Sequence, residues 1–171
     1  MNTTLAVVAA AVATVCLAAT AAAQAPHAMP PSQGFEQLQL LVGDWEGQTS
    51  GGKTSRVSFR LVSGGTALLE RLQTGDEPEM ITVYTPDGDR LAVTHFCSAG
   101  NQPQMRTQPL TGPAKRFSFD YVGATNLATP ATGHMHHLAV TITDRDHFTQ
   151  EWTWTEGGQA RTELFRFTRT G

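Results

Sequence analysis

The sequence predicts an all-β protein: an antiparallel up-and-down barrel of about ten strands preceded by one short helix. After Trp45, apolar and polar residues alternate with a period of two, and turns rich in Gly, Asp and Pro separate the alternating segments. The segments follow one another at hairpin spacing, with no helical pattern between them that would connect parallel strands. Closing such a meander into a barrel removes its unpaired edges, which favours a barrel over a sandwich.

The short helix is predicted over residues 35–42. Phe35, Leu38 and Leu41 recur at three- and four-residue spacing, Ser32 is a candidate N-cap, and Gly43 ends the pattern. Clear turn signals follow at residues 86–89 (Pro-Asp-Gly-Asp) and 156–159 (Glu-Gly-Gly-Gln). The predicted strands include residues 67–73, 91–97, 104–109, 117–121, 135–143, 147–155 and 160–169, with a long loop at residues 123–133.

The first part of the chain has the character of an export signal. No charged residue occurs before Glu36, and residues 5–23 form an apolar run that ends in small residues at Ala21 and Ala23. We therefore expect residues 1–23 to be a signal peptide, 24–33 a flexible spacer and 34–171 the barrel domain. The chain would then be exported to the periplasm or the extracellular space. An uncleaved membrane anchor is the competing interpretation, because no Lys or Arg precedes the apolar run.

Cleavage after Ala23 would remove Cys16 and leave Cys97 as the only thiol, so that no disulfide forms within the mature chain. Cys97 is then buried, paired between chains, or a ligand. No stable membrane insertion is expected once the signal is removed, and the sequence carries no signal for oligomeric state.

Charge excludes one class of partner. The net charge is −3, from 12 Lys and Arg against 15 Asp and Glu, and no basic block occurs. Binding to nucleic acid needs clustered cations, so a nucleic-acid partner is not expected.

A family resemblance starts at Gly43-Asp44-Trp45, which follows the predicted helix and opens the first strand. This motif resembles the Gly-x-Trp start of the calycin superfamily, which includes lipocalins, fatty-acid-binding proteins and nitrobindin-like barrels. The resemblance implies that Trp45 lies across the closed end of the barrel and stacks with an Arg of the last strand. Arg166 is the first candidate for that partner and Arg169 the second. The resemblance also implies a small, mostly apolar ligand inside the barrel.

Later segments extend the resemblance over most of the predicted mature chain. Residues 87–103, together with residues 133–137 and 148–154, resemble uncharacterised exported bacterial lipocalin-like proteins of the nitrobindin-like barrel type. That group implies no activity. The haem-ligating histidine of nitrobindin is not matched to a position in this chain.

Four side chains form a candidate metal or haem site. His95 and Cys97 lie two residues apart on one predicted strand, and His134 and His136 lie two apart on another. Each pair continues into alternating aliphatic residues, so we expect all four to point into the barrel unless a one-residue bulge reverses a pair. Imidazole and thiolate suit a transition metal such as zinc, or the axial position of haem iron.

Two other interpretations of these residues stay open. The histidines are buried imidazoles bonded to polar neighbours such as Gln150, or residues 134–137 form a solvated loop edge. Further candidate ligand contacts are Trp152, which shares a face with Trp154 and suits a planar ligand, and Asn101 in a loop. Glu70 is a candidate only in the register that turns it inward, where a carboxylate needs a partner.

Three functional classes remain. The first is an exported small-ligand-binding barrel that holds an apolar or planar ligand, with a metal or haem as an option. The alternative is a metal-dependent enzyme that uses the His/Cys site in the same barrel. The third is an envelope protein whose barrel is filled by its own side chains. A cavity lined by the candidate residues would favour the first two.

Overall fold

The computed structural model describes residues 33–170. The predicted signal peptide, most of the predicted spacer and the candidate cap Ser32 lie outside these residues. Among residues 33–170, no helix has the length and apolar character needed to cross a membrane. The elements in order are α1 (Gln33–Leu38), η1 (Gln39–Leu41), β1 (Gly43–Thr49), β2 (Thr54–Val62), η2 (Ser63–Gly65), β3 (Ala67–Thr74), β4 (Met80–Asp87), β5 (Arg90–Phe96), β6 (Gln102–Arg106), β7 (Arg116–Thr125), β8 (His134–Ile142), β9 (His147–Glu156) and β10 (Gln159–Arg169).

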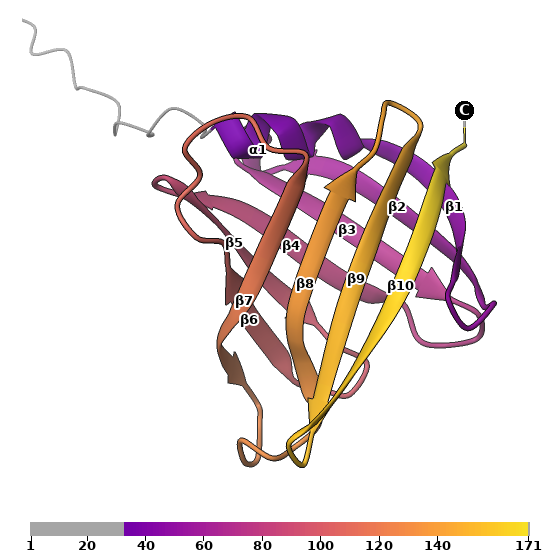
Figure 1. Cartoon of the computed structure of the whole chain (residues 1–171), viewed down its shortest axis with the longest axis vertical. Coiled ribbons are helices and arrows are strands. Elements are labelled where there is room, and N and C mark those ends of the chain that lie inside the picture. Colours follow the sequence, from indigo (N-terminus) through magenta and orange to yellow (C-terminus); the bar gives the residue numbers. More distant parts are fainter. Residues whose placement is uncertain (1–32, 171) are drawn as a thin grey trace, which may run out of the picture.

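The ten strands form a closed antiparallel barrel in which each strand pairs with its neighbours in the sequence (Figure 1). The ring closes where β1 pairs with β10, with Trp45 directly opposite Arg169. This confirms the predicted fold class. One strand is displaced: β6 covers residues 102–106 instead of 104–109, and Pro109, which has no N–H, lies beyond its end.

α1 and η1 lie across one end of the barrel, which we call the closed end (Figure 1). Their apolar face is buried, with Phe35, Leu38 and Leu41 at most 1% exposed. Trp45 at the start of β1 is also buried, and its Nε1 donates a 2.8 Å hydrogen bond to the carbonyl of Leu41. The helical residues and the first strand are therefore fixed to each other at this end.

The arginine partner of Trp45 is Arg169. Its guanidinium carbon lies 4.0 Å from the centre of the Trp45 ring. The first candidate, Arg166, was wrong, because Phe165 and Phe167 on either side of it face the core and Arg166 is exposed on the outer face. Only the second candidate occupies the position opposite Trp45.

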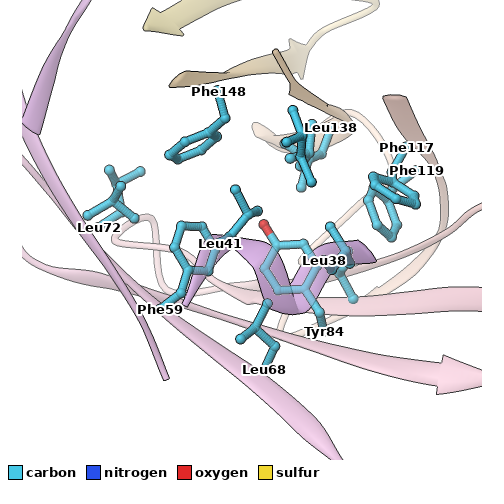
Figure 2. Close-up of a cluster of buried hydrophobic side chains, with 14 of the residues drawn as sticks. Leu38, Leu41, Phe59, Leu68, Leu72, Tyr84, Phe117, Phe119, Leu138 and Phe148 are labelled. Carbon is cyan, nitrogen blue, oxygen red and sulfur yellow. The ribbon is translucent and has the colours of Figure 1, made fainter. Parts of the chain in front are cut away.

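The half of the barrel next to α1 is filled by side chains. Figure 2 shows Leu38 and Leu41 packed among residues of six different strands, with the Tyr84 hydroxyl directed into the interior. The cluster is rich in aromatic rings, and the Trp45 and Phe148 rings meet edge to face at 4.7 Å. Its labelled strand members are Phe59, Leu68, Leu72, Tyr84, Phe117, Phe119, Leu138 and Phe148.

Candidate ligand-binding site

A cavity of about 530 Å³ opens at the other end of the barrel, away from α1. The turns after β1 and β3 form part of its rim, and the inner faces of the strands form its walls. We call this end the open end. Its lining consists of Ser50, Gly51, Leu72, Thr74, Glu77, Met80, His95, Met135, Trp152, Trp154, Arg161, Thr162, Glu163 and Phe165. The interior is therefore divided into a packed half and a half with space for a ligand.

The walls of the cavity are largely apolar. Trp152 and Trp154 contribute two indole rings from β9, and Leu72, Met135 and Phe165 add to them from three other strands. The Trp154 ring packs directly over Gly133, at a place where a Cβ atom on residue 133 would collide with it. The lack of a side chain at Gly133 thus sets the position of one wall.

A polar row, which we define as Glu70, Thr82 and His95, lies at and beneath the deep end of the cavity. These residues lie directly opposite one another on β3, β4 and β5, and each is only 1% exposed. Of the three, only His95 lines the cavity. Thr82 Oγ1 lies 3.0 Å from His95 Nδ1, and the imidazole contacts the Trp152 ring at a centroid distance of 4.6 Å.

The second ring nitrogen of His95 has no partner. Nε2 is buried and forms no hydrogen bond with the part of the chain that the structure describes. Burial lowers the pKa of His95 to about 4, because the charged imidazolium loses its hydration there. At neutral pH the ring is therefore uncharged, with one polar atom that needs a hydrogen-bonding partner.

Glu70 is held below the cavity by a hydrogen-bonded chain. Its Oε2 accepts bonds from the Tyr84 hydroxyl at 2.5 Å and from Gln150 Nε2 at 2.8 Å. Trp152 Nε1 donates in turn to Gln150 Oε1 at 3.3 Å. Burial raises the pKa of Glu70 to about 7, although both hydrogen bonds oppose that change. The chain connects a carboxyl group that titrates near neutrality with an indole in the cavity wall.

The predicted orientation of His134 and His136 was wrong. The pairing of β8 with β9 shifts between Met135 and His137, which marks a bulge at His136. As a result Met135, opposite Trp154, lines the cavity, whereas neither histidine does. His136 is exposed, and its Nδ1 lies 3.1 Å from His134 Nε2.

Those two histidines instead contact Tyr121, with ring centroids at 4.8 Å for His134 and 4.7 Å for His136. The pairing of β7 with β8 ends at Asp120 and His137, so these three rings lie beyond the last pair of that ladder. His134 is buried, and its Nδ1 lies 2.7 Å from the carbonyl of Thr132. Its ring nitrogens are therefore already occupied by local partners.

Cys97 and Asn101 belong to the turn between β5 and β6. Cys97 follows the last residue of β5 and is half-buried, which raises the pKa of its thiol. Asn101 Nδ2 donates to the carbonyl of Gly133 at 2.9 Å, while its Oδ1 is buried without a partner among residues 33–170. Asn101 thus connects this turn to the start of β8, and neither residue lines the cavity.

The four predicted metal ligands therefore do not converge. His95 lines the cavity, Cys97 lies in a turn, and the other two histidines lie beside Tyr121. Within residues 33–170, no three His, Cys, Asp or Glu side chains are arranged to hold one metal ion. Of the other predicted ligand contacts, Trp152 lines the cavity, and Gln150 and Glu70 lie beneath it.

Several lining residues were not predicted. Met135 was not predicted to face the interior, because strict alternation places His134 and His136 inside and Met135 outside. Leu72 and Phe165 carry an ordinary core pattern, and no sequence signal separates a cavity wall from a packed core at such positions. Trp154, by contrast, is predicted together with Trp152 as a ring that suits a planar ligand, since the two lie two residues apart on one strand.

The fold and cavity together define a closed ten-stranded antiparallel barrel, consistent with a lipocalin-like fold, that has space for a small ligand. No protein-family model matches the chain, and a comparison with curated protein sequences finds no significant match. Among solved structures, Rv2717c from M. tuberculosis is similar, with a TM-score of 0.61, 13% identity, and coverage of 83% of this chain and 100% of that chain.

A second similar structure is a protein of unknown function from the DUF3598 family of Nostoc punctiforme PCC 73102. Its TM-score is 0.55 at 15% identity, with 86% of this chain covered. This chain spans about half the length of that protein, 53% of it. At such identities both likenesses concern the barrel fold alone.

Proposed function

We propose that this chain is an exported small-ligand-binding barrel of the nitrobindin-like type, which holds an apolar or planar ligand at its open end. The observation that carries the proposal is the cavity of about 530 Å³, with two tryptophans in its wall and with His95, whose buried Nε2 has no partner among residues 33–170, at its deep end. Small-molecule sites commonly have this size, mostly apolar walls and few polar groups. The filled-barrel interpretation does not account for such a space.

The cavity walls favour a flat, apolar body. Trp152 and Trp154 provide broad aromatic faces, and Met135 adapts its shape readily to a ligand. The charged residues Glu77, Arg161 and Glu163 belong to the lining but are less buried than Trp152. Ligand binding would therefore depend on burial of apolar area, with polar contacts selecting among ligands.

The metal-dependent enzyme needs His95, Cys97, His134 and His136 around one ion, and their positions do not fit a zinc site. Haem would depend on a lone pair at His95 Nε2, the one predicted axial ligand that lines the cavity. A haem titration followed by absorption spectroscopy tests that option. Small-ligand binding without a metal is the function that the geometry supports best.

The test is binding of N-phenyl-1-naphthylamine, a neutral aromatic fluorophore, to the purified mature protein. We expect saturable fluorescence enhancement in the wild type and at least about tenfold weaker binding in Met135→Trp, which fills the cavity. The matched control is Leu61→Trp, because Leu61 is 42% exposed and lies outside the cavity. Equal binding by all three proteins would contradict the proposed site.

Export is proposed from the character of residues 1–23. The test is the intact mass of the protein recovered from its native host. We expect a mass that corresponds to residues 24–171, and recovery outside the cytoplasm. A chain that begins at Met1 and remains with the membrane would support the anchor interpretation instead.

A further inference from the structure

The hydrogen bond between Thr82 and His95 determines which ring nitrogen carries the proton. Thr82 is 1% exposed, and its only side-chain hydrogen bond within residues 33–170 is the one to His95 Nδ1. A buried hydroxyl needs an acceptor for its hydrogen. Among residues 33–170, the one acceptor that lies within hydrogen-bonding geometry of this hydroxyl is Nδ1 itself.

Two arrangements of protons are conceivable for this pair. If Thr82 donates to Nδ1, the proton of the neutral ring lies on Nε2, and the Nε2–H is the single group left without a partner. If Nδ1–H donates to Thr82, both the Thr82 hydroxyl hydrogen and the Nε2 lone pair are left unpaired. The first arrangement is favoured, because each buried unpaired polar group destabilises the protein.

We infer that His95 presents an Nε2–H donor to the cavity, and that the ligand is an uncharged planar molecule with a hydrogen-bond-accepting oxygen, such as an aromatic ketone. This inference rests on the proposed function and specifies the ligand class. An oxygen at the deep end would pair His95 Nε2, which is the only buried side-chain N or O atom of the lining residues that has no partner among residues 33–170. The aromatic body would then lie against Trp152, which contacts the same imidazole.

The absence of charge on the ligand follows from the surroundings of His95. The ring itself is neutral, since burial lowers its pKa, and it supplies a single hydrogen bond. Glu70, the single carboxyl group of the polar row, would repel an anion once ionised. A carboxylate at this depth would lose its hydration without gaining a cation.

A proton on Nε2 also disfavours a metal ion bound to His95. A metal ion needs the Nε2 lone pair, which would require the proton to move to Nδ1. Thr82 would then lose the only acceptor of its hydroxyl. The Thr82 side chain therefore selects an acceptor ligand over an iron or zinc ion at this position.

The proton position is measured by NMR on protein with ¹⁵N-labelled imidazole rings. We expect His95 Nε2 to be the protonated nitrogen in the wild type, and Thr82→Val to shift the tautomer towards Nδ1–H. A wild-type ring protonated at Nδ1 would overturn the inference whether or not any ligand binds.

The ligand class is measured with a matched pair of probes, 2-acetylnaphthalene and 2-isopropenylnaphthalene, which differ by a carbonyl oxygen in place of a methylene group. Wild-type protein should bind the ketone about tenfold more tightly by calorimetry. His95→Phe should bind the two probes equally. His95→Gln should restore the preference, because the amide oxygen can accept from Thr82 while the amide nitrogen donates to the ketone.

The outcomes separate this inference from the proposed function. Equal wild-type binding of the ketone and the hydrocarbon would overturn the inference and leave a ligand-binding barrel. Tighter binding of 2-naphthoate than of the ketone would overturn the uncharged class. Failure of these three probes alongside binding of N-phenyl-1-naphthylamine would overturn the inference alone, whereas failure of all four would overturn both.

Discussion

The guanidinium of Arg169, at the end of β10, lies 4.0 Å from the centre of the Trp45 ring at the start of β1. Arg169 also donates 2.8 Å hydrogen bonds to the carbonyls of Val42 and Leu40. One side chain thus satisfies carbonyl groups where the helical segment meets the barrel and covers the indole at the same time. At the closed end of the barrel, Arg169 thus joins the last strand, β10, to the first strand and to the helical segment before it.

Arg169→Ala should therefore reduce the free energy of unfolding by about 2 kcal/mol, since it removes a cation–π contact and several hydrogen bonds to carbonyl groups. The measurement is equilibrium urea unfolding. Arg166→Ala is the matched control, because Arg166 lies on the outer face of the same strand. Its effect should be within about 0.5 kcal/mol of zero. Equal losses in the two variants would contradict the role given to Arg169.

Glu70→Gln should stabilise the protein at alkaline pH. The folded-state pKa of Glu70 is raised to about 7 from 4.5. The contribution of protonated Glu70 to the free energy of unfolding is therefore fully present below pH 4.5 and is lost as the pH rises through 7. The variant should be more stable than the wild type by about 3 kcal/mol at pH 8 and nearly equal at pH 4. Urea unfolding at both pH values measures this, with exposed Glu36→Gln as the control.

His95 should produce the opposite pH dependence. Its folded-state pKa is lowered to about 4 from 6.5. The contribution of neutral His95 to the free energy of unfolding is therefore fully present above pH 6.5 and is lost as the pH falls through 4. Between pH 4.5 and 6.5 the contributions of His95 and Glu70 have opposite slopes, and we expect the wild-type stability to be nearly constant there.

Urea unfolding of the two single variants at several pH values separates these two opposite pH dependences of stability. From pH 4.5 to 6.5, the stability of His95→Gln should fall, because of the two buried groups only Glu70 still titrates. Over the same range the stability of Glu70→Gln should rise, because only His95 does. Parallel curves for the wild type and both variants would show that neither buried group controls the pH dependence.

Gly133→Ala should weaken ligand binding while the barrel stays folded. The added Cβ would collide with the Trp154 ring and move it within the cavity. Gly123→Ala is the matched control, because its Cβ would meet no atom within 4 Å. We expect a loss of probe affinity of about tenfold in the first variant alone, together with a shifted tryptophan emission maximum. An unchanged affinity would mean that Trp154 is not part of the site.

Most of the fold could be predicted from the sequence because alternation with a period of two is a local property. Inward-facing Leu91 and Val93 correctly placed His95 inside the barrel. The same argument failed at His136, because a bulge adds one residue to a strand without any distinctive composition. The arginine partner of Trp45 depends on the register between the first and last strands, which composition alone does not determine.

The site was less predictable than the fold for a related reason. His95 and Trp152 could be proposed because their residue types are unusual on an inner strand face. The contrast between a packed half and a hollow half arises from how side chains of all ten strands fill one volume. Leu72 illustrates this, since it belongs both to the core cluster and to the cavity wall.

The buried face of α1 at the closed end would also affect how fast a bound ligand exchanges with solution. With Phe35, Leu38 and Leu41 filling that end, a ligand associates and dissociates through the same opening. A substitution at Ser50 or Gly51 that narrows the opening without contacting the bound molecule would slow both rate constants by the same factor. Residence time would then lengthen while Kd stays constant, so retention of the ligand is adjustable independently of affinity.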